Sequence, residues 1–81
     1  MEKTQRLETF LAMAQDRLSL TSAADCTRIE SHKDENGILE DVELYSIGGT
    51  FFLTDLIVIV EALQLSCWVD IQNNEIRFHI Y

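Results

Sequence analysis

His32 is the residue of this 81-residue chain whose surroundings look most like those of a chemical site. Asp34 and Glu35 follow it closely, and Asp41 lies in the same acidic segment. Imidazole and carboxylate groups can ligate a metal ion, but a metal site also requires them to converge at fixed geometry. One histidine among the carboxylates of a turn is more typical of a solvated charged loop. We therefore expect no bound metal and no cofactor.

Other patterns that could support ion binding or catalysis are incomplete. Residues 34–37, Asp-Glu-Asn-Gly, resemble part of a calcium-binding loop, but the glutamate that completes such a loop is missing at its spacing. A cysteine nucleophile needs an accessible thiolate beside a base. Cys67 and His79 are expected on opposite faces of one hairpin, and Cys26 lies about 20 Å from His32 along an extended strand. The sequence contains no phosphate loop and no Ser/His/Asp arrangement, so we predict that the protein is not an enzyme.

The composition limits the classes of partner. The net charge of −8 argues against binding to nucleic-acid phosphates or to an anionic membrane, and it permits a basic protein partner. A hydrophobic content of 47% is high for so small a domain, so some apolar surface is expected to be buried against a partner. Residues 56–60, the longest apolar run, are too few to span a bilayer, and residues 1–6 precede no apolar signal core. We expect a cytoplasmic protein, in which the redox state of Cys26 and Cys67 is open.

The C-terminal segment from Ser66 to Tyr81 predicts a β-hairpin. Asn tolerates positive φ, so Asn73 and Asn74 suit a two-residue type I′ turn. The predicted pairs are Gln72–Glu75, Ile71–Ile76, Asp70–Arg77, Val69–Phe78, Trp68–His79 and Cys67–Ile80. The face expected to join the core carries Cys67, Val69, Ile71, Ile76, Phe78 and Ile80. The opposite face gathers Trp68, His79 and Tyr81, which form either a cluster that braces the sheet or a contact patch.

Residues 26–47 predict a second hairpin with its turn at residues 34–37. Gly37 can take the left-handed position that ends a four-residue loop, which pairs Ile29 with Val42. A two-residue loop at positions 36 and 37 is an alternative that keeps the same residues on each face. The residues expected to face the core are Ile29, Ile38, Val42 and Leu44. The residues expected to point away are Arg28, Glu30, His32, Asp41, Glu43 and Tyr45.

Two segments predict helices. Residues 4–18 carry an apolar stripe at helical spacing, formed by Leu7, Phe10, Leu11, Ala14 and Leu18. Residues 54–65 carry a stripe of Leu56, Ile59, Val60 and Leu63. The β-branched run 57–60 favours a strand, but the Thr-Asp start and the length favour a helix, which we choose. Residues 21–25 are expected to form a connector and Gly48-Gly49 a strand break. Residues 50–53 are expected to form a short extended or turning segment, with at least one of Phe51 and Phe52 in the core.

These elements predict an α+β fold in one domain, residues 1–81. Two helices would pack on one face of a four-stranded antiparallel sheet, in the order helix, hairpin, helix, hairpin. That order suggests a doubled αββ unit, residues 4–47 and 53–81. The order of the strands in the sheet is not determined by the sequence.

The function expected from these features is a non-catalytic protein–protein interaction module that forms a homodimer. The second helix is apolar nearly all round, and aromatic side chains lie on the outer face of the second hairpin. The candidate interface residues are Ile57, Val58, Glu61, Leu65, Trp68, His79 and Tyr81. The alternative is an acidic inhibitor, immunity protein or nucleic-acid mimic that binds a basic partner through the 30–43 hairpin. Its candidate acidic patch is Glu30, Asp34, Glu35, Glu40, Asp41 and Glu43.

Overall fold

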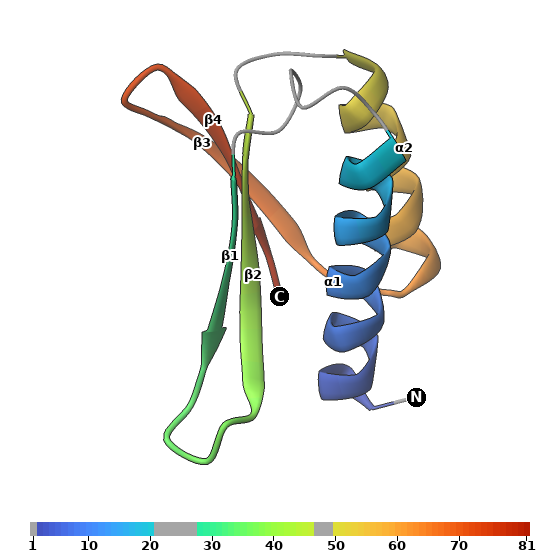
Figure 1. The fold of residues 1–81 in the computed structure, drawn as a ribbon, viewed down its shortest axis with the longest axis vertical. Helices are drawn as coiled ribbons and strands as arrows, with labels where there is room; N and C mark the ends of the chain where they lie inside the picture. The colour runs from blue at the N-terminus through green and yellow to red at the C-terminus, as the bar shows by residue number, and fades with distance from the viewer. Residues whose placement is uncertain (1, 21–27, 47–49) are drawn as a thin grey trace.

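The computed structural model describes residues 2–20, 28–46 and 50–81, without the side chains of residues 17–20, 50–55 and 72. The elements are α1 (Lys3–Leu20), β1 (Arg28–Lys33), β2 (Leu39–Ser46), α2 (Thr50–Ala62), β3 (Cys67–Gln72) and β4 (Glu75–Ile80). Both helices lie side by side on one face of the sheet (Figure 1). The predicted α+β class and the predicted element order are therefore confirmed. The predicted connector 21–25, the break at 48–49 and the side chains of Leu18, Phe51 and Phe52 lie outside the described residues.

The four strands form one antiparallel sheet in the order β1-β2-β4-β3. The two central strands, β2 and β4, come from different hairpins, and β1 and β3 form the two edges. If the two αββ halves of the chain are exchanged, β1 with β3 and β2 with β4, the strand order is the same when read from the other edge. The doubled unit of residues 4–47 and 53–81 stays a prediction, but the arrangement of the elements is the one that such a unit would have.

The hairpin of β3 and β4 has the register that its sequence predicts. All the predicted pairs are present, from Gln72 opposite Glu75 to Cys67 opposite Ile80. Asn73 and Asn74 have φ angles of 52° and 67°, as a type I′ turn requires. The ladder continues one pair beyond the strands, because Ser66 and Tyr81 exchange two backbone hydrogen bonds of 2.7 and 3.0 Å.

The turn between β1 and β2 differs from the predicted four-residue loop. The Gly37 N–H donates to the Asp34 carbonyl at 3.0 Å, and the Asp34 N–H donates to the Ile38 carbonyl at 2.9 Å. Residues 35–37 therefore form a three-residue loop, in which Gly37 has a φ of +79°. The Asp34 carboxylate accepts hydrogen bonds from the N–H groups of Asn36 and Ile38, at 2.8 and 3.0 Å. These bonds hold the turn closed.

A bulge in β2 corrects the predicted register of this hairpin. Lys33 lies opposite Leu39 and His32 opposite Asp41, so Glu40 is the additional residue. The predicted pairing of Ile29 with Val42 is wrong, because Ile29 lies opposite Leu44. The pairs from Arg28–Tyr45 to His32–Asp41 are those that the alternative two-residue loop at positions 36 and 37 predicted.

The bulge also changes which residue at the turn reaches the core. Leu39 is buried, whereas Ile38, which was predicted to face the core, is 47% exposed. The extra residue reverses the alternation of side chains between the bulge and the turn.

Replacing Gly37 by Ala should lower the free energy of unfolding by about 1–2 kcal/mol, because an L-residue is strained at positive φ. No atom lies within 4 Å of the position that the added methyl group would take, so the loss would come from the backbone alone. Urea unfolding measures the change. Glu35→Ala in the same loop is the control and should change the stability little. Equal effects of the two substitutions would contradict the role given to Gly37.

The second helix begins earlier and ends earlier than its pattern predicts. The choice of a helix over a strand for residues 57–60 is confirmed. The prediction of an extended or turning segment at 50–53 is wrong, because α2 begins at Thr50. The helix ends with Gln64 in the left-handed conformation, at a φ of 54°, and the Leu65 N–H donates to the Val60 carbonyl at 3.0 Å.

Arg6 of α1 connects the two helices. Its Nη1 donates to the carbonyls of Leu63 and Gln64, at 3.3 and 2.8 Å. A cation is favourable at this position, because the last carbonyls of a helix carry partial negative charge. No pattern in the sequence predicted this long-range contact.

The core lies between the helices and the two central strands. Its buried side chains are Leu7, Phe10, Ala14, Leu39, Val42, Leu44, Leu56, Ile59, Val60, Phe78 and Ile80. The predicted burial of the β3 side chains is wrong: Cys67 is exposed, and Val69 and Ile71 are 54% and 75% exposed. The strand is an edge strand, and its hairpin leads away from the helices toward the turn (Figure 1).

Candidate functional site

The predicted interface residues do not form one surface. Ile57, Val58 and Glu61 are exposed on α2, which lies on the helix-covered face of the sheet. The second group, Trp68, His79 and Tyr81, lies on the opposite face, here called the open face. Leu65 belongs to neither group, because it packs partly buried against the core. The sequence prediction therefore combined side chains from two separate surfaces.

An apolar groove of about 460 Å³ lies on the helix side of the sheet. It runs between α2 and the β3–β4 hairpin. Its lining residues are Ile57, Val60, Glu61, Cys67, Val69, Ile76 and Phe78. Burial by neighbouring groups raises the pKa of the Cys67 thiol, so this side chain is uncharged at neutral pH. Glu61 is therefore the charged residue of this lining.

The outer edge of β3 presents unpaired backbone groups within the described part of the chain. Ser66 and Tyr81 exchange both of their hydrogen bonds, and such pairs alternate along an antiparallel ladder. The N–H and C=O groups of Cys67, Val69 and Ile71 therefore point away from β4. The same residues carry the exposed apolar side chains of this edge. Sequence analysis missed this surface because it assigned these side chains to the core.

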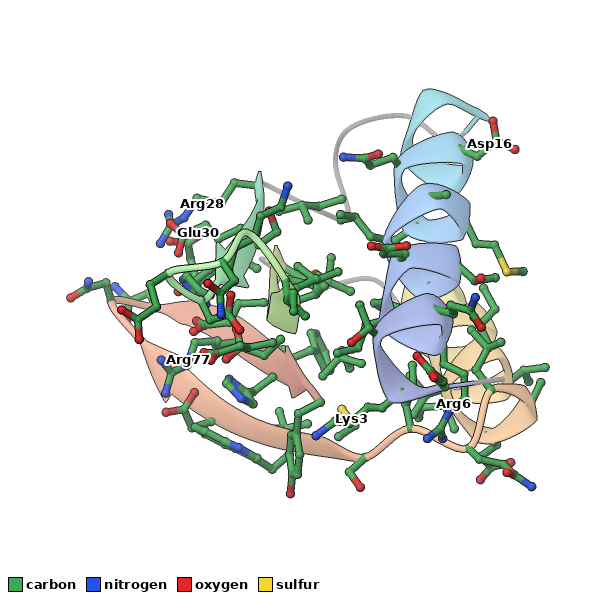
Figure 2. The ribbon with its side chains drawn as sticks, turned by 90° about the horizontal axis from the view of Figure 1, so that it is seen from below. Lys3, Arg6, Asp16, Arg28, Glu30 and Arg77 are labelled. Carbon is green, nitrogen blue, oxygen red and sulfur yellow. The ribbon has the colours of Figure 1, made fainter. Side chains whose placement is uncertain are left out.

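Side chains on the open face lie in rows that cross the strands. The first row joins Arg28, Tyr45, Arg77 and Asp70, which are opposite one another in the register. The Arg28 guanidinium lies 3.7 Å from the centre of the Tyr45 ring. Arg77 donates two hydrogen bonds to the Asp70 carboxylate, at 2.9 and 2.8 Å, as the predicted cross-strand pair implies. Figure 2 shows Arg28 and Arg77 on this side of the sheet, away from the helices.

The aromatic side chains form the next part of the open face. The rings of Trp68 and His79 stack with their centroids 5.0 Å apart, and Tyr81 lies 5.4 Å from His79. The Arg77 guanidinium lies 4.9 Å from the Trp68 ring centre. These contacts are those of a cluster that braces the sheet. A role of the cluster in partner binding stays a prediction.

Histidine and carboxylate groups converge beside the aromatic cluster. His32 Nδ1 lies 2.5 Å from Asp41 Oδ1 and 3.6 Å from Glu43 Oε1. His79 Nδ1 lies 3.7 Å from the same Glu43 oxygen, and His79 Nε2 lies 3.9 Å from Asp41 Oδ2. The hydrogen bond with Asp41 raises the pKa of His32. The sequence grouped His32 with Asp34, Glu35 and Asp41; the sheet places it beside Asp41 and adds Glu43 and His79 to the group.

Glu43 is the carboxylate at the centre of this group. It was predicted to point away from the core, and it does, but the neighbouring side chains bury it. The Tyr45 hydroxyl donates to Glu43 Oε2 at 2.8 Å, and Arg77 Nη1 lies 3.4 Å from the same oxygen. The hydrogen bond with Glu43 raises the pKa of Tyr45.

The predicted acidic patch is largely engaged within the chain. Glu30 lies 3.2 Å from the Arg28 guanidinium (Figure 2), and Asp34 closes its turn. Asp41 and Glu43 contact the histidines described above. The two remaining members, Glu35 and Glu40, are exposed to solvent. Binding of a basic partner by this hairpin stays a prediction, but four of its six carboxylates already have partners here.

Comparisons of the chain with protein-family models, with curated proteins and with solved structures gave no match. Among the described residues, neither helix has the length and the apolar character needed to cross a membrane.

Proposed function

We propose that this protein is a non-catalytic interaction module that forms a homodimer through the β3 edge and the apolar groove beside it. The observation that carries the proposal is the coincidence of two features on one strand. Val69 and Ile71 expose apolar side chains, and the backbone groups of the same residues point outward. An exposed apolar edge strand is a template for pairing with another chain, and stable proteins normally cover or charge such an edge.

The other edge strand of the sheet, β1, is more highly charged than β3. β1 carries Arg28, Glu30, His32 and Lys33 along six residues, which is the protected, charged type of edge. β3 has Asp70 as its charged residue, and the Arg77 guanidinium neutralises that carboxylate. We therefore expect a second chain to pair with β3 and not with β1.

A second copy of the chain suits this surface better than a basic protein. The protein has a net charge of −8, of which residues 30–43, with six carboxylates and one lysine, contribute −5. The groove lining, in contrast, contains a single carboxylate, Glu61. Two copies would meet at a surface with few charges, where like-charge repulsion is weak.

The outward backbone groups allow a register centred on Val69, the middle one of Cys67, Val69 and Ile71. With a two-fold axis at Val69, the two Val69 residues lie opposite each other as a hydrogen-bonded pair, and Cys67 lies opposite Ile71 of the second copy. On the open face, Trp68 then lies opposite Asp70 of the second copy. An axis at Asp70 would oppose two carboxylates, which is unfavourable. The Val69 register joins two four-stranded sheets into one eight-stranded sheet.

The helix side of the groove would contribute to the same interface. Ile57 and Val58 are exposed on α2, Val58 by 60%, and Ile57 lines the groove. Of the residues predicted from sequence, Ile57 and Glu61 line the groove, and Trp68 belongs to the strand that would pair. His79 and Tyr81 would remain on the open face of the sheet. The exposed thiol of Cys67 at the contact suits the reducing conditions of the cytoplasm, which is the compartment that we propose.

Sedimentation equilibrium over a wide concentration range tests the proposal. We expect a reversible dimer whose dissociation constant changes little between low and high salt, because the contact is apolar and backbone-mediated. A protein that remains monomeric up to the highest concentration would overturn the proposal. If the monomer instead captured a basic protein in a salt-sensitive manner, the acidic hairpin would be the functional surface.

A further inference from the structure

We propose that His32, Asp41, Glu43 and His79 form a binding site for one divalent transition-metal ion, with zinc as the best-fitting ion. The site lies on the open face of the sheet, away from the apolar groove, and it does not depend on the homodimer. The proposal rests on four observations: the register, the distances, the surrounding hydrogen bonds and one buried unpaired nitrogen atom.

The sheet register brings the four side chains together from three adjacent strands. His32 of β1 lies opposite Asp41 of β2, and Glu43 of β2 lies opposite His79 of β4. Asp41 and Glu43 are two positions apart on one strand, so their side chains share a face. A rigid sheet thus positions two imidazoles and two carboxylates next to each other, which is the preorganisation that a metal site requires.

The distances between the candidate ligand atoms fit a small ion. One ligand atom each from His32, Asp41 and Glu43 lies within 4.8 Å of the others. Zinc bonds of 2.0–2.2 Å in a tetrahedron place ligand atoms about 3.3–3.6 Å apart. Glu43 Oε1 lies 3.6 Å from His32 Nδ1 and 3.7 Å from His79 Nδ1, and both separations are close to that value. The 2.5 Å contact of His32 with Asp41 would open by about 1 Å when an ion takes the place of this direct contact.

Neighbouring side chains orient the ligands as the surroundings of a metal site do. Tyr45 and Arg77 both contact Glu43 Oε2, which leaves Oε1 directed at the two histidines. His32 Nε2 lies 3.9 Å from Glu30 Oε2, so the ring nitrogen opposite the proposed ligand atom faces a carboxylate. A carboxylate that accepts a hydrogen bond from that nitrogen fixes the tautomer of a metal-binding histidine; at 3.9 Å, Glu30 acts on His32 through its charge.

His79 supplies the observation that an ordinary ion-pair network does not explain. Its Nδ1 is buried and has no hydrogen-bond partner among the described residues. A buried polar atom normally has a partner, and a metal ion would provide one. Stacking of the ring against Trp68, with Tyr81 beside it, holds this nitrogen 3.7 Å from Glu43 Oε1.

The ligand types select the class of ion. Imidazole nitrogen suits zinc and other late transition metals, whereas calcium and magnesium require oxygen ligands. Two ionised carboxylates balance the charge of one dication when both histidines are neutral. The ion would also relieve the repulsion between Glu43 and the opposing Glu30, which lie across from each other on β1 and β2.

Zinc titration of tag-free, chelator-stripped protein tests the site. Calorimetry should give one ion per chain. Because the chain has one tryptophan, which stacks on His79, Trp68 fluorescence should change with the same stoichiometry. His32→Gln and His79→Gln should each weaken binding about tenfold or more, and the double variant should lose saturable binding. Glu35→Gln, an exposed carboxylate of the same hairpin, is the matched control and should bind zinc as the unaltered protein does.

Two results would overturn the site. One is the absence of saturable zinc binding at concentrations up to about 1 mM, and the other is an unchanged affinity in the double variant. If His79→Gln does not fold, His32→Gln still provides the test, because the His32 side chain is 44% exposed and its loss leaves the aromatic stack in place. Magnesium in the same titration should cause no fluorescence change, and an equal response to magnesium would show that the carboxylates bind cations without selectivity.

Discussion

Replacing Val69 by Lys should convert the dimer to a monomer. In the proposed register the two Val69 residues face each other on the two-fold axis, so the substitution places two ammonium groups in contact within an apolar groove. Loss of apolar burial and like-charge repulsion together should cost about 2–4 kcal/mol, a weakening of dimerisation of roughly hundredfold. Sedimentation equilibrium measures this change directly.

The matched control for this substitution is Ile38→Lys. Ile38 is exposed to a similar extent, 47% against 54% for Val69, but it lies at the distal turn of the other hairpin. It should leave the dimer intact. The circular dichroism spectra of both variants should match that of the unaltered chain, because both side chains lie outside the core. Equal dimerisation of the two variants would show that the β3 edge is not the contact.

Replacing Phe10 by Ala should have the largest effect on stability. Phe10 is fully buried in α1, at 0% exposure, within the cluster that joins both helices to β2 and β4. Truncating a buried Phe typically costs about 3–5 kcal/mol, through lost burial and the cavity that remains. Since a domain of this length has a total stability of only about 4–12 kcal/mol, a large fraction of the variant should be unfolded at 37 °C.

Urea unfolding at a fixed protein concentration measures the effect of Phe10→Ala, because dimerisation makes apparent stability depend on concentration. Met13 lies on the same helix and is 40% exposed, so Met13→Ala is the control and should cost less than about 1 kcal/mol. A loss of stability for Phe10→Ala as small as that of Met13→Ala would contradict the described core.

The elements with strong local patterns could be predicted from the sequence. The β3–β4 register followed from a two-residue Asn turn and strict alternation, both of which are local. The β1–β2 register did not, because the bulge at Glu40 leaves no mark in the sequence. The early start of α2 at Thr50 was missed because Thr54-Asp55 matches the start signal of a helix, and the prediction placed the first turn there.

The candidate sites depend on information that is not local. The exposure of Val69 and Ile71 depends on β3 lying at the edge of the sheet, and alternation alone does not distinguish an edge strand from a central one. The approach of His79 to Glu43 requires β2 and β4 to be neighbours, and the sequence did not determine the strand order. In both cases the residue types were visible in the sequence, but their juxtaposition came from the topology.

Oxidative cross-linking at position 69 tests the proposed dimer most directly. In a chain with Cys26→Ser and Cys67→Ser, the substitution Val69→Cys places two thiols opposite each other on the two-fold axis. Opposing residues of a hydrogen-bonded antiparallel pair have Cα atoms about 5.5 Å apart, which is within the range of a disulfide, about 4.4–6.8 Å. The proposal predicts rapid and nearly complete formation of a covalent dimer under mild oxidation. Ile38→Cys in the same background should cross-link only slowly, and equal rates at the two positions would contradict the paired β3 edge.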